Sequence, residues 1–372
     1  MSILCDLVLL SWNNLEQTRS CLETLFSSTT VPCRLIIVDN GSEADVRGFL
    51  ADVKPQGAIR EVVLLQNERN EGFPKGMNRG IRASKAAFVC LLNNDLLFTD
   101  GWLEELICVA GLDPAIGVVN PTSSTFGNVP PAGMSLGAYA ETLRRHSGQY
   151  TEVGMCIGFC LLITRACLAR IGPLSEEIDR MFFEDEDFCA RAQQAGYRCV
   201  VAAGAYVYHA EHQSVQKVPE REAIFARNQR WCHARWGRWV RVAWPRFAPI
   251  APGSDELRRW MERLLGWARR RTHVYVYCPV PGRLTAAELF RSVGLVPHAD
   301  IRWHQVPPRL ARWAAAGSIL KRRKKQFDII VAPDDGWGNS LRRLAWVHRA
   351  QVIPENNEEQ LKVLWETSRF RS

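Results

Sequence analysis

The sequence of 372 residues lacks several features that would place it in a class at once. It has no apolar run of about 18 residues, the length that a membrane-spanning helix needs. Its first residues show no basic segment followed by an apolar stretch and a small-residue cleavage site, so we expect a cytoplasmic protein. Its twelve cysteines include no Cys-x-x-Cys pair. We therefore expect reduced cysteines in the core and no zinc site.

Acidic residues are fewer than basic ones, 39 against 47, which gives a formal net charge of +8. The basic residues gather in an Arg- and Trp-rich stretch from Arg227 to Phe247 and in the run KRRKK at 321–325. Such patches can bind nucleic acid, anionic lipid headgroups or phosphorylated substrates, or can form a solvated helix face. No nucleic-acid-binding motif accompanies them, so we expect no nucleic-acid partner.

Strand and helix signals alternate along the chain. Short apolar runs such as CRLIIVD are followed by segments with apolar residues at helical spacing, such as LEQTRSCLETLFSS. This pattern predicts an α/β fold with a mostly parallel sheet flanked by helices. The Pro-rich stretch PRFAPIAPGSD indicates a linker, after which the alternation resumes. We therefore predict a main domain at 1–245, a linker with a basic helix at 246–271, and a smaller α/β domain at 272–372 that recognises an acceptor or a partner.

Polar residues follow four successive predicted strands. In chain order they are Ser11 and Asn13, then Asp39, then the glycine-bearing turn NERNEGFPKGMNRG, then Asn93, Asn94 and Asp95. Because the carboxyl ends of parallel strands meet at one edge of a sheet, these side chains predict a site for a polar ligand.

Each of these features has a second interpretation. Asp39 can accept hydrogen bonds from a ribose or a base, or can start the Asn-Gly turn that follows it. Gly72 and Gly76 can let the backbone approach a diphosphate at a helix N-terminus, or can only allow a strand and a helix to pack closely. Asp95 can bind Mg²⁺ or Mn²⁺ together with substrate phosphates, or can cap a helix.

Four consecutive acidic residues, 184–187, stand between two phenylalanines and an amphipathic segment. Crowded carboxylates beside apolar residues raise one another's pKa unless a cation or a reacting proton donor shares the site. The run is therefore either part of a catalytic site or a set of acids that stabilise a helix N-terminus. The stretch from Asn120 to Val153, rich in Gly, Pro, Ser and Thr, predicts a mobile loop on the acceptor side.

Seven motifs in order carry a family resemblance: LLSWNN, IIVDNGS, NxxNxGFxxGxNxG, LLNND, GFCLLITR, FFEDEDFCARAQQAGYRC and VYHAEHQS. Their succession resembles the family-2 inverting glycosyltransferases of the GT-A nucleotide-diphospho-sugar transferase fold, particularly the bacterial rhamnosyltransferase-like branch. The resemblance covers roughly residues 3–235.

The resemblance implies a role for each matching residue. Asp185 would be the catalytic base, and Glu184 and Asp187 would position the acceptor or cap the helix. Asp95 and His209 would bind Mg²⁺ or Mn²⁺, with Asn93 in place of the first Asp of the D-x-D motif and His212 where the family has Gly. The donor site would be formed by Ser11, Asn13, Asp39, Asn70, Gly72, Gly76, Asn78, Asn93 and Asn94.

The activity implied is metal-dependent, inverting transfer of a hexosyl or deoxyhexosyl group from a UDP-, GDP- or dTDP-sugar to a hydroxyl group. The acceptor would be a glycan or glycolipid in bacterial cell-surface synthesis, and the Arg/Trp stretch would then suit contact with the inner face of the membrane. A protein or peptide acceptor is the alternative within this class. A catalytically silent protein that binds nucleotide sugars is the alternative outside it.

Overall fold

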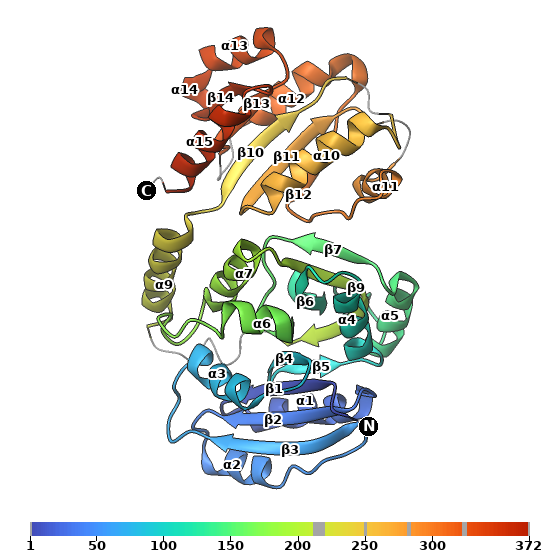
Figure 1. Ribbon diagram of the computed structural model, residues 1–372, viewed down its shortest axis with the longest axis vertical. Coiled ribbons are helices and arrows are strands. Elements are labelled where there is room, and N and C mark those ends of the chain that lie inside the picture. The colour runs from blue at the N-terminus through green and yellow to red at the C-terminus, as the bar shows by residue number, and fades with distance from the viewer. Residues whose placement is uncertain (1, 211–219, 249–250, 281–283, 322–325, 371–372) are drawn as a thin grey trace. The chain divides into compact units, whose positions relative to one another are not determined.

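The computed structural model describes residues 2–210, 220–248, 251–280, 284–321 and 326–370 (Figure 1). His212 and the basic residues that follow Lys321 therefore lie outside the described residues. The chain divides into two compact units, one of Met1–Thr151 with Met155–Cys232 and one of Glu152–Gly154 with His233–Ser372. The division follows Cys232, earlier in the chain than the boundary at 245 that the composition suggested.

The first unit contains a nine-stranded sheet in the order β3-β2-β1-β4-β8-β6-β9-β5, with β7 paired to β9. Its strands are β1 (Cys5–Ser11), β2 (Cys33–Asp39), β3 (Ile59–Gln66), β4 (Phe88–Asn93), β5 (Leu96–Phe98), β6 (Ile116–Thr122), β7 (Tyr150–Val153), β8 (Cys160–Thr164) and β9 (Arg198–His209). Its helices are α1 (Leu15–Ser28), α2 (Ala44–Ala51), α3 (Phe73–Ala83), α4 (Trp102–Gly111), α5 (Leu136–Leu143), α6 (Arg165–Ile171), α7 (Glu184–Gln194) and α9 (Arg221–Trp236).

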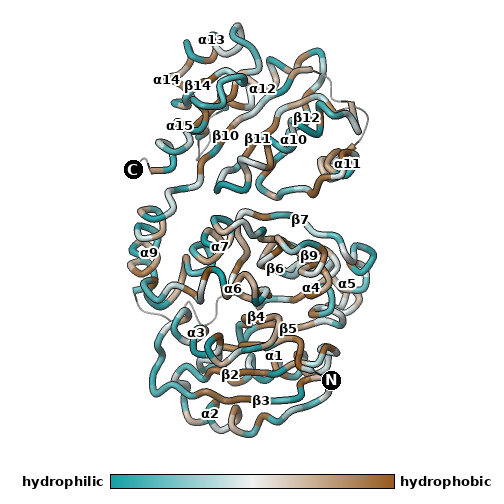
Figure 2. Tube along the Cα trace, viewed as in Figure 1, coloured by the Kyte–Doolittle hydropathy of each residue, from teal (hydrophilic) through white to brown (hydrophobic). Residues whose placement is uncertain are grey.

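The four strands β3, β2, β1 and β4 run parallel, whereas β8 runs antiparallel to its neighbours β4 and β6. Every residue of β1 and β2 is buried, and Figure 2 shows β2 near the hydrophobic end of the scale and α9 largely near the hydrophilic end. Strands buried along their whole length are typical of a parallel sheet covered on both faces. The predicted α/β fold class with a mostly parallel central sheet is confirmed.

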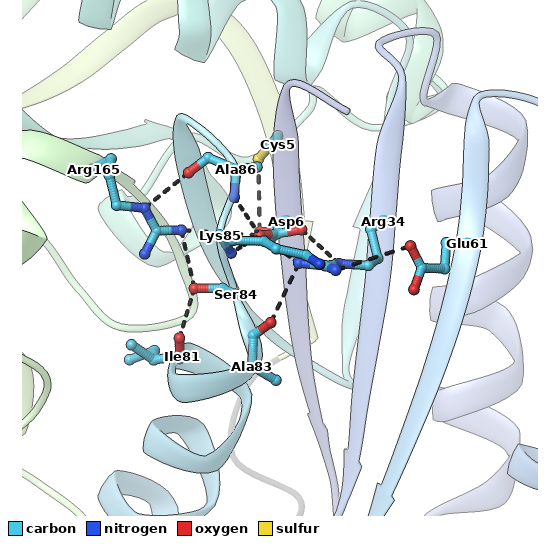
Figure 3. Close-up of polar contacts among 10 residues, drawn as sticks. All are labelled: Cys5, Asp6, Arg34, Glu61, Ile81, Ala83, Ser84, Lys85, Ala86 and Arg165. Atoms are coloured by element: carbon cyan, nitrogen blue, oxygen red, sulfur yellow. Dashed lines mark hydrogen bonds and ion pairs between the residues drawn. The ribbon is translucent and has the colours of Figure 1, made fainter. Parts of the chain in front are cut away.

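A buried ion pair ties the amino ends of these strands together (Figure 3). Arg34 of β2 donates to both carboxylate oxygens of Asp6 on β1, through Nε at 2.9 Å and Nη2 at 3.0 Å. The same carboxylate accepts hydrogen bonds from the backbone N–H groups of Lys85 at 2.6 Å and Ala86 at 2.7 Å, just before β4. Asp6 is fully buried, so its charge depends on these partners.

The segment from Asn120 to Val153 is not one loop. It contains the end of β6, the short 3₁₀ helices η1 (Ser124–Phe126) and η2 (Arg144–His146), α5 and β7. The buried Asn120 side chain accepts from the N–H of Ile157 and donates to the carbonyl oxygens of Ile157 and Cys160. The start of the segment is therefore bonded to the stretch just before β8 and to the first residue of that strand.

The second unit is built on a five-stranded, entirely parallel sheet in the order β12-β11-β10-β13-β14. Its strands are β10 (Val240–Pro245), β11 (Thr272–Cys278), β12 (Ile301–Gln305), β13 (Ile329–Ala332) and β14 (Gln351–Pro354). Its helices are α10 (Asp255–Ala268), α11 (Ala286–Ser292), α12 (Ala311–Leu320), α13 (Asp335–Arg343), α14 (Ala345–His348) and α15 (Glu358–Arg369), with the 3₁₀ helix η3 at Pro308–Leu310. Helices cover both faces of this sheet.

Two elements belong to the second unit although we had assigned them to the main domain and the linker. Strand β10 is the middle strand of the second sheet. Helix α10 buries Leu257, Met261, Leu264 and Ala268, which recur at helical spacing, in the core on one face of that sheet. The Arg and Trp residues around them suggested a basic surface, and this hid the apolar stripe.

Candidate active site at the carboxyl edge of the first sheet

The register of the parallel strands brings the predicted strand-end residues to one edge. Ser11 at the end of β1 lies opposite Asp39 at the end of β2, and Asn93 at the end of β4 lies opposite Leu10. This arrangement follows from the pairing alone, because parallel strands that start together also end together. The polar edge is where ligands of such sheets bind.

Asp39 forms the turn contact that its sequence context allowed, and its role toward a ligand stays a prediction. Its Oδ1 accepts a hydrogen bond from the backbone N–H of Ser42 at 2.9 Å, which closes the turn after β2. Its Oδ2 is buried without a hydrogen-bond partner among the described residues, and lies 3.4 Å from Nε of Arg47. One carboxylate oxygen is therefore structural, and the other retains an acceptor for a ligand hydroxyl or N–H group.

Asn13 continues this edge. It has a positive φ of 56°, as does Asn14 after it, and its backbone N–H donates to Oγ of Ser42 at 2.9 Å. Its Oδ1 accepts from the backbone N–H of Glu43 at 2.9 Å. The loops after β1 and β2 are thus bonded together around Asp39.

Ser11 and Asn94 belong to a buried network behind this edge. Nδ2 of Asn94 donates to Oγ1 of Thr18 at 2.9 Å, and the Thr18 and Ser11 hydroxyl oxygens lie 3.4 Å apart. Both predicted residues are buried. They fix the first loop to the end of β4 and so support the edge from within.

The glycine-bearing turn packs closely instead of standing open. A Cβ on Gly72, whose φ is +86°, would lie 2.6 Å from Cα of Arg180, and a Cβ on Gly76 would lie 2.5 Å from Cδ1 of Leu10. Oδ1 of Asn70 accepts from the backbone N–H of Gly72 at 2.8 Å and from the Asn40 side chain at 2.9 Å. These residues set the course of the backbone along the edge.

Asn78, two residues after Gly76 on α3, is bonded to a different segment. It is fully buried, and its amide donates to the carbonyl oxygen of Leu174 and to Oε1 of Glu176, both at 2.9 Å. The backbone N–H of Leu174 in turn donates to its Oδ1 at 3.0 Å. The donors and the acceptor of this side chain are therefore used to hold the segment that leads to the acidic run.

Asp95 and His209 meet because β5 pairs antiparallel with the end of β9, which places Leu96 opposite His209. Oδ1 of Asp95 lies 3.1 Å from Nε2 of His209, yet this oxygen is buried without a hydrogen-bond partner among the described residues. Nδ2 of Asn93 lies 3.5 Å from the same ring nitrogen. Oδ1 of Asp95 and Nε2 of His209 therefore face each other, and no hydrogen bond joins them.

The orientation of the His209 ring is fixed from two sides. Its Nδ1 lies 2.9 Å from Oγ1 of Thr125, and its ring stacks on Phe159 with centroids 5.2 Å apart. When Nδ1 carries the proton and donates to Thr125, Nε2 presents its lone pair toward Asp95, as a metal-binding imidazole does. Neither Thr125 nor Phe159 was predicted, although Phe159 lies within the motif GFCLLITR.

The donor set fits a hard or borderline divalent cation that also binds a substrate. Among the described residues no group of three or more His, Cys, Asp and Glu side chains could hold a metal ion. Asp95 and His209 alone would leave the remaining positions to phosphate oxygens and water, which is the usual arrangement for Mg²⁺ and Mn²⁺ in phosphate-binding sites.

The acidic run begins helix α7 after a strained turn. Arg180, Phe182 and Phe183 have φ values of 59°, 71° and 73°, a region that non-glycine residues rarely adopt. Conformations of this kind cost on the order of 1–3 kcal/mol each and persist only where surrounding contacts hold them. The strain therefore marks this turn as a candidate part of the site.

Burial raises the pKa values of Glu184 and Asp185, the first two residues of α7. Desolvation raises the pKa of Glu184 to about 8, with a further contribution from the charge of Asp185. Desolvation also raises the pKa of Asp185 to about 7, although the backbone N–H groups of Gly158 and Glu186 oppose this. Oε2 of Glu184 is buried without a hydrogen-bond partner among the described residues. A carboxyl group with a pKa near 7 can accept a proton at neutral pH and can release it again.

The Asp187 carboxylate forms an ion pair with Arg191. It is fully buried, and its Oδ2 accepts from Nε of Arg191 at 2.8 Å, one turn along α7. Arg191 also donates to the carbonyl oxygens of Ile171 at 2.7 Å and Pro173 at 2.9 Å. This third predicted carboxylate therefore anchors α7 to the segment after α6.

Two adjacent residues join the carboxylates to the Asp95–His209 pair. The backbone N–H of Gly158 donates to Oδ2 of Asp185 at 3.2 Å, and Phe159 stacks on His209. The carbonyl oxygen of Phe159 accepts from the backbone N–H of Asn93 at 2.9 Å. The structure thus brings Asp185, His209 and the end of β4 together around one short segment.

Helix α9 braces the strained turn from outside the predicted site. Nδ2 of the buried Asn228 donates to the carbonyl oxygens of Asp179 at 2.8 Å and Met181 at 2.7 Å. The neighbouring Arg227 forms an ion pair with the Asp179 carboxylate. We missed Asn228 because an amide on a basic helix looks like a solvated residue until its partners, far away in the sequence, are known.

The raised pKa values predict a dependence of stability on pH. Between the ordinary carboxyl pKa of 4.5 and about 8, folded Glu184 keeps a proton that the unfolded chain has released. The free energy of unfolding must therefore fall as pH rises through this window. We expect Glu184→Gln to match the wild type at pH 4 and to be more stable at pH 8, by on the order of a few kcal/mol. Urea unfolding at both values measures this, and equal stability at pH 8 would contradict the buried, protonated carboxyl.

Comparisons with known proteins bear on the family of the chain. Residues 6–234 match the family described as "Glycosyltransferase like family 2". An uncharacterized protein of Sinorhizobium fredii is 27% identical over 63% of this chain and 27% of its own length. A putative glycosyltransferase, EpsH, of Bacillus subtilis is 27% identical over 31% of this chain and 33% of its own length.

Among solved structures, a mannosyltransferase of Pyrobaculum calidifontis in complex with GDP-Man and Mn²⁺ is 14% identical, with a TM-score of 0.45, over 62% of this chain and 69% of that one. The matched part of this chain spans only about a quarter to a third of the length of the two curated relatives described above. Within the described residues no helix is long and apolar enough to cross a membrane. The family match covers more than half of the chain, and the chain therefore belongs to glycosyltransferase-like family 2.

Proposed function

We propose that the first unit is a metal-dependent, inverting glycosyltransferase that moves a hexosyl or deoxyhexosyl group from a nucleotide-diphosphate sugar to a hydroxyl group. The observation that carries this is the Asp95–His209 pair, whose facing oxygen and nitrogen stand 3.1 Å apart without a hydrogen bond, next to a carboxylate with a raised pKa. A phosphate-bound cation and a proton acceptor are the two needs of such a transfer.

The polar edge of the first sheet supports a donor site in which different residues bind the nucleotide and the diphosphate. Oδ2 of Asp39, buried and without a hydrogen-bond partner among the described residues, would accept from the base or ribose of the nucleotide. Asn13 and the turn at Asn70, Gly72 and Gly76 would shape the floor beside it. Asp95 and His209 would hold Mg²⁺ or Mn²⁺, which neutralises the charge that develops on the leaving diphosphate.

The reaction itself would depend on Asp185. The acceptor oxygen forms a bond to the anomeric carbon as the bond from that carbon to the diphosphate oxygen breaks on the opposite face, and the acceptor proton passes to the Asp185 carboxylate. The backbone N–H groups of Gly158 and Glu186 hold this carboxylate in place. Buried Glu184, protonated at neutral pH, would line the acceptor side without competing as a base.

For the acceptor, a glycan or glycolipid of the bacterial cell surface is our first choice and a protein the second. The enzyme would then act in the cytoplasm, in contact with the inner face of the membrane when the acceptor is lipid-linked. The second unit, whose parallel sheet is separate from the donor site residues, would recognise the acceptor or a partner.

The test is calorimetric titration of UDP-, GDP- and dTDP-sugars with and without Mn²⁺. We expect Mn²⁺ to tighten binding of at least one of them, because the cation bridges the protein and the diphosphate. Asp95→Ala should weaken this metal-dependent binding by about 10–100-fold, because one of two protein ligands is lost. Asp100→Ala, a change of the same residue type at an exposed position five residues on, is the control and should bind as the wild type does.

Three results would count against the proposed function. Absence of binding by the wild type to every donor would remove the donor site. Binding that neither Mn²⁺ nor Asp95→Ala alters would remove the metal role of Asp95 and His209. Metal-dependent binding with no transfer or hydrolysis would favour the silent nucleotide-sugar-binding protein.

A further inference from the structure

Three helices on one face of the second sheet present an unusual outer surface, which we call the α12–α14 face. Helices α12 and α13 bury Ala311, Ala315, Ile319, Trp337 and Leu341 in the core on this face of the sheet. Helix α14 packs against both α12 and α13 (Figure 1). The side chains opposite these buried positions point to solvent.

Two tryptophans on this face are largely exposed to solvent. Trp313 of α12 is 79% exposed and Trp346 of α14 is 78% exposed, more than any other large hydrophobic residue that the structure describes. Leu310, 57% exposed, precedes Trp313 by one helical turn and so lies beside it. Single exposed apolar residues are ordinary, but two exposed indole rings on helices that pack against each other, with Leu310 beside one of them, are a candidate contact surface.

The same face carries positive charge without matching acids. Arg309, Lys321, Arg343 and Arg349 are exposed, and their side chains make no ion pair with any residue in the described ranges. Asp334 already pairs with Arg312 at 3.0 Å, which leaves Asp335 as the exposed acid on these helices. The four basic side chains are therefore available to an anionic partner.

We propose that the α12–α14 face docks on an anionic lipid bilayer, with Trp313 and Trp346 as anchors in the headgroup region. Tryptophan prefers the boundary between water and acyl chains, because its ring is apolar while its N–H can still reach water or headgroups. Arginine and lysine around such anchors gain from the negative surface potential of the membrane. A nucleic acid would use the charge, but within the described residues the structure shows these two tryptophans on separate helices and no groove that is lined by a series of aromatic rings, as single strands use.

This assignment moves the membrane contact away from the Arg/Trp stretch at 227–247. There, Arg238 pairs with Asp328, and Arg241 lies over the ring of Tyr275 at 4.7 Å from its centroid. Trp244 of the same stretch is fully buried. Much of that stretch is thus engaged within its own unit, whereas the α12–α14 face is open.

The experiment is flotation of the full chain with vesicles of phosphatidylcholine alone or with phosphatidylglycerol added. We expect binding only to the anionic vesicles. Trp313→Ala with Trp346→Ala should weaken it by about tenfold or more, because both anchors are lost. Changing Arg309, Arg343 and Arg349 to Gln should also weaken it, by about fivefold for each charge removed.

Matched controls come from other faces of the chain. Val363→Ala with Phe370→Ala removes two exposed apolar side chains on and just after α15, and changing Arg170, Arg259 and Arg291 to Gln removes three exposed charges elsewhere. Both controls should bind as the wild type does. Since Trp313 and Trp346 are so exposed, their replacement should leave the unfolding curve unchanged, which a melt of the same variant checks.

Three results would overturn the docking face. They are no binding of the wild type to anionic vesicles, equal binding by the double tryptophan variant, and equal loss in the controls. Salt-sensitive binding to oligonucleotides with no vesicle binding would likewise replace the membrane by nucleic acid. The nucleotide titrations test donor binding and do not depend on the α12–α14 face. A failure of the docking proposal would therefore leave the proposed function standing, and the reverse also holds.

Discussion

The Asp185→Asn chain should bind the nucleotide sugar as tightly as the wild type and release its nucleoside diphosphate about 10²–10⁴-fold more slowly. The amide keeps the shape of the carboxylate, and its single oxygen can accept from the backbone N–H of either Gly158 or Glu186, which bond to different oxygens of Asp185. Neither contact belongs to the proposed donor site, so donor binding should be unaffected. It cannot take up a proton. Hydrolysis of the donor by water is a sufficient readout, since the same base would deprotonate water.

The neighbouring carboxyl provides the control. Glu184→Gln changes the same kind of group one residue earlier, but the pKa of Glu184, raised to about 8, already keeps this group protonated at neutral pH. We expect it to retain most activity. Its rate should still rise with pH around 7, the pKa to which desolvation raises Asp185. The reverse pattern, with Glu184→Gln inactive and Asp185→Asn active, would transfer the role of base to Glu184.

The largest effect on stability is expected at the opposite end of the sheet. Asp6→Ala removes the partner of the buried Arg34 guanidinium and the acceptor of two backbone N–H groups, those of Lys85 and Ala86 (Figure 3). Arg34 would keep only a 3.9 Å contact with the exposed Glu61, and a buried charge that loses its main partner typically costs about 3–5 kcal/mol. Urea unfolding followed by circular dichroism should show the loss.

Two further variants make this prediction specific. Glu141→Ala breaks an exposed ion pair with Arg144 and should cost less than about 1 kcal/mol. The double change Asp6→Leu with Arg34→Met removes both charges and should cost less than Asp6→Ala alone, because no charge is left unpaired. A double variant less stable than the single one would show that the pair matters for its shape and hydrogen bonds more than for its charge.

The strand ends could be predicted from the sequence because they depend on periodicity alone. A short run rich in β-branched residues and closed by an Asn-Gly turn, such as CRLIIVD, favours a covered strand, and parallel pairing then places Ser11, Asp39 and Asn93 at one edge. The turn that Asp39 closes was also visible, and it uses only one of the two carboxylate oxygens. These features are local, or follow from a rule of sheet topology.

Contacts between distant segments could not be predicted in this way. Asp6 is the second residue of an apolar strand, and nothing nearby indicates that Arg34 lies beside it. Asn228 holds the turn at Asp179 and Met181 from a helix much later in the chain. Asn78 was expected at the donor site, but its amide is bonded to the segment around Leu174. In each case a buried polar group needs a partner, and only the fold shows which one it has.

The domain boundary was misplaced for a related reason. A short strand such as β10 has no periodicity long enough to identify it, and its Arg and Trp neighbours resemble a surface helix. Pairing with β11 and β13 makes it the middle of the second sheet. The order of strands in a parallel sheet is set by crossovers that leave no mark on any single strand.

The most direct test of the central claim is proton NMR of donor hydrolysis by the wild type with Mn²⁺, read at the anomeric proton of the sugar that is released first. The account predicts Mn²⁺-dependent release with inverted configuration, so that an α-linked UDP- or GDP-sugar yields the β-sugar first. Release of the α-sugar first, or no release from any donor tested, would contradict a metal-dependent inverting transferase.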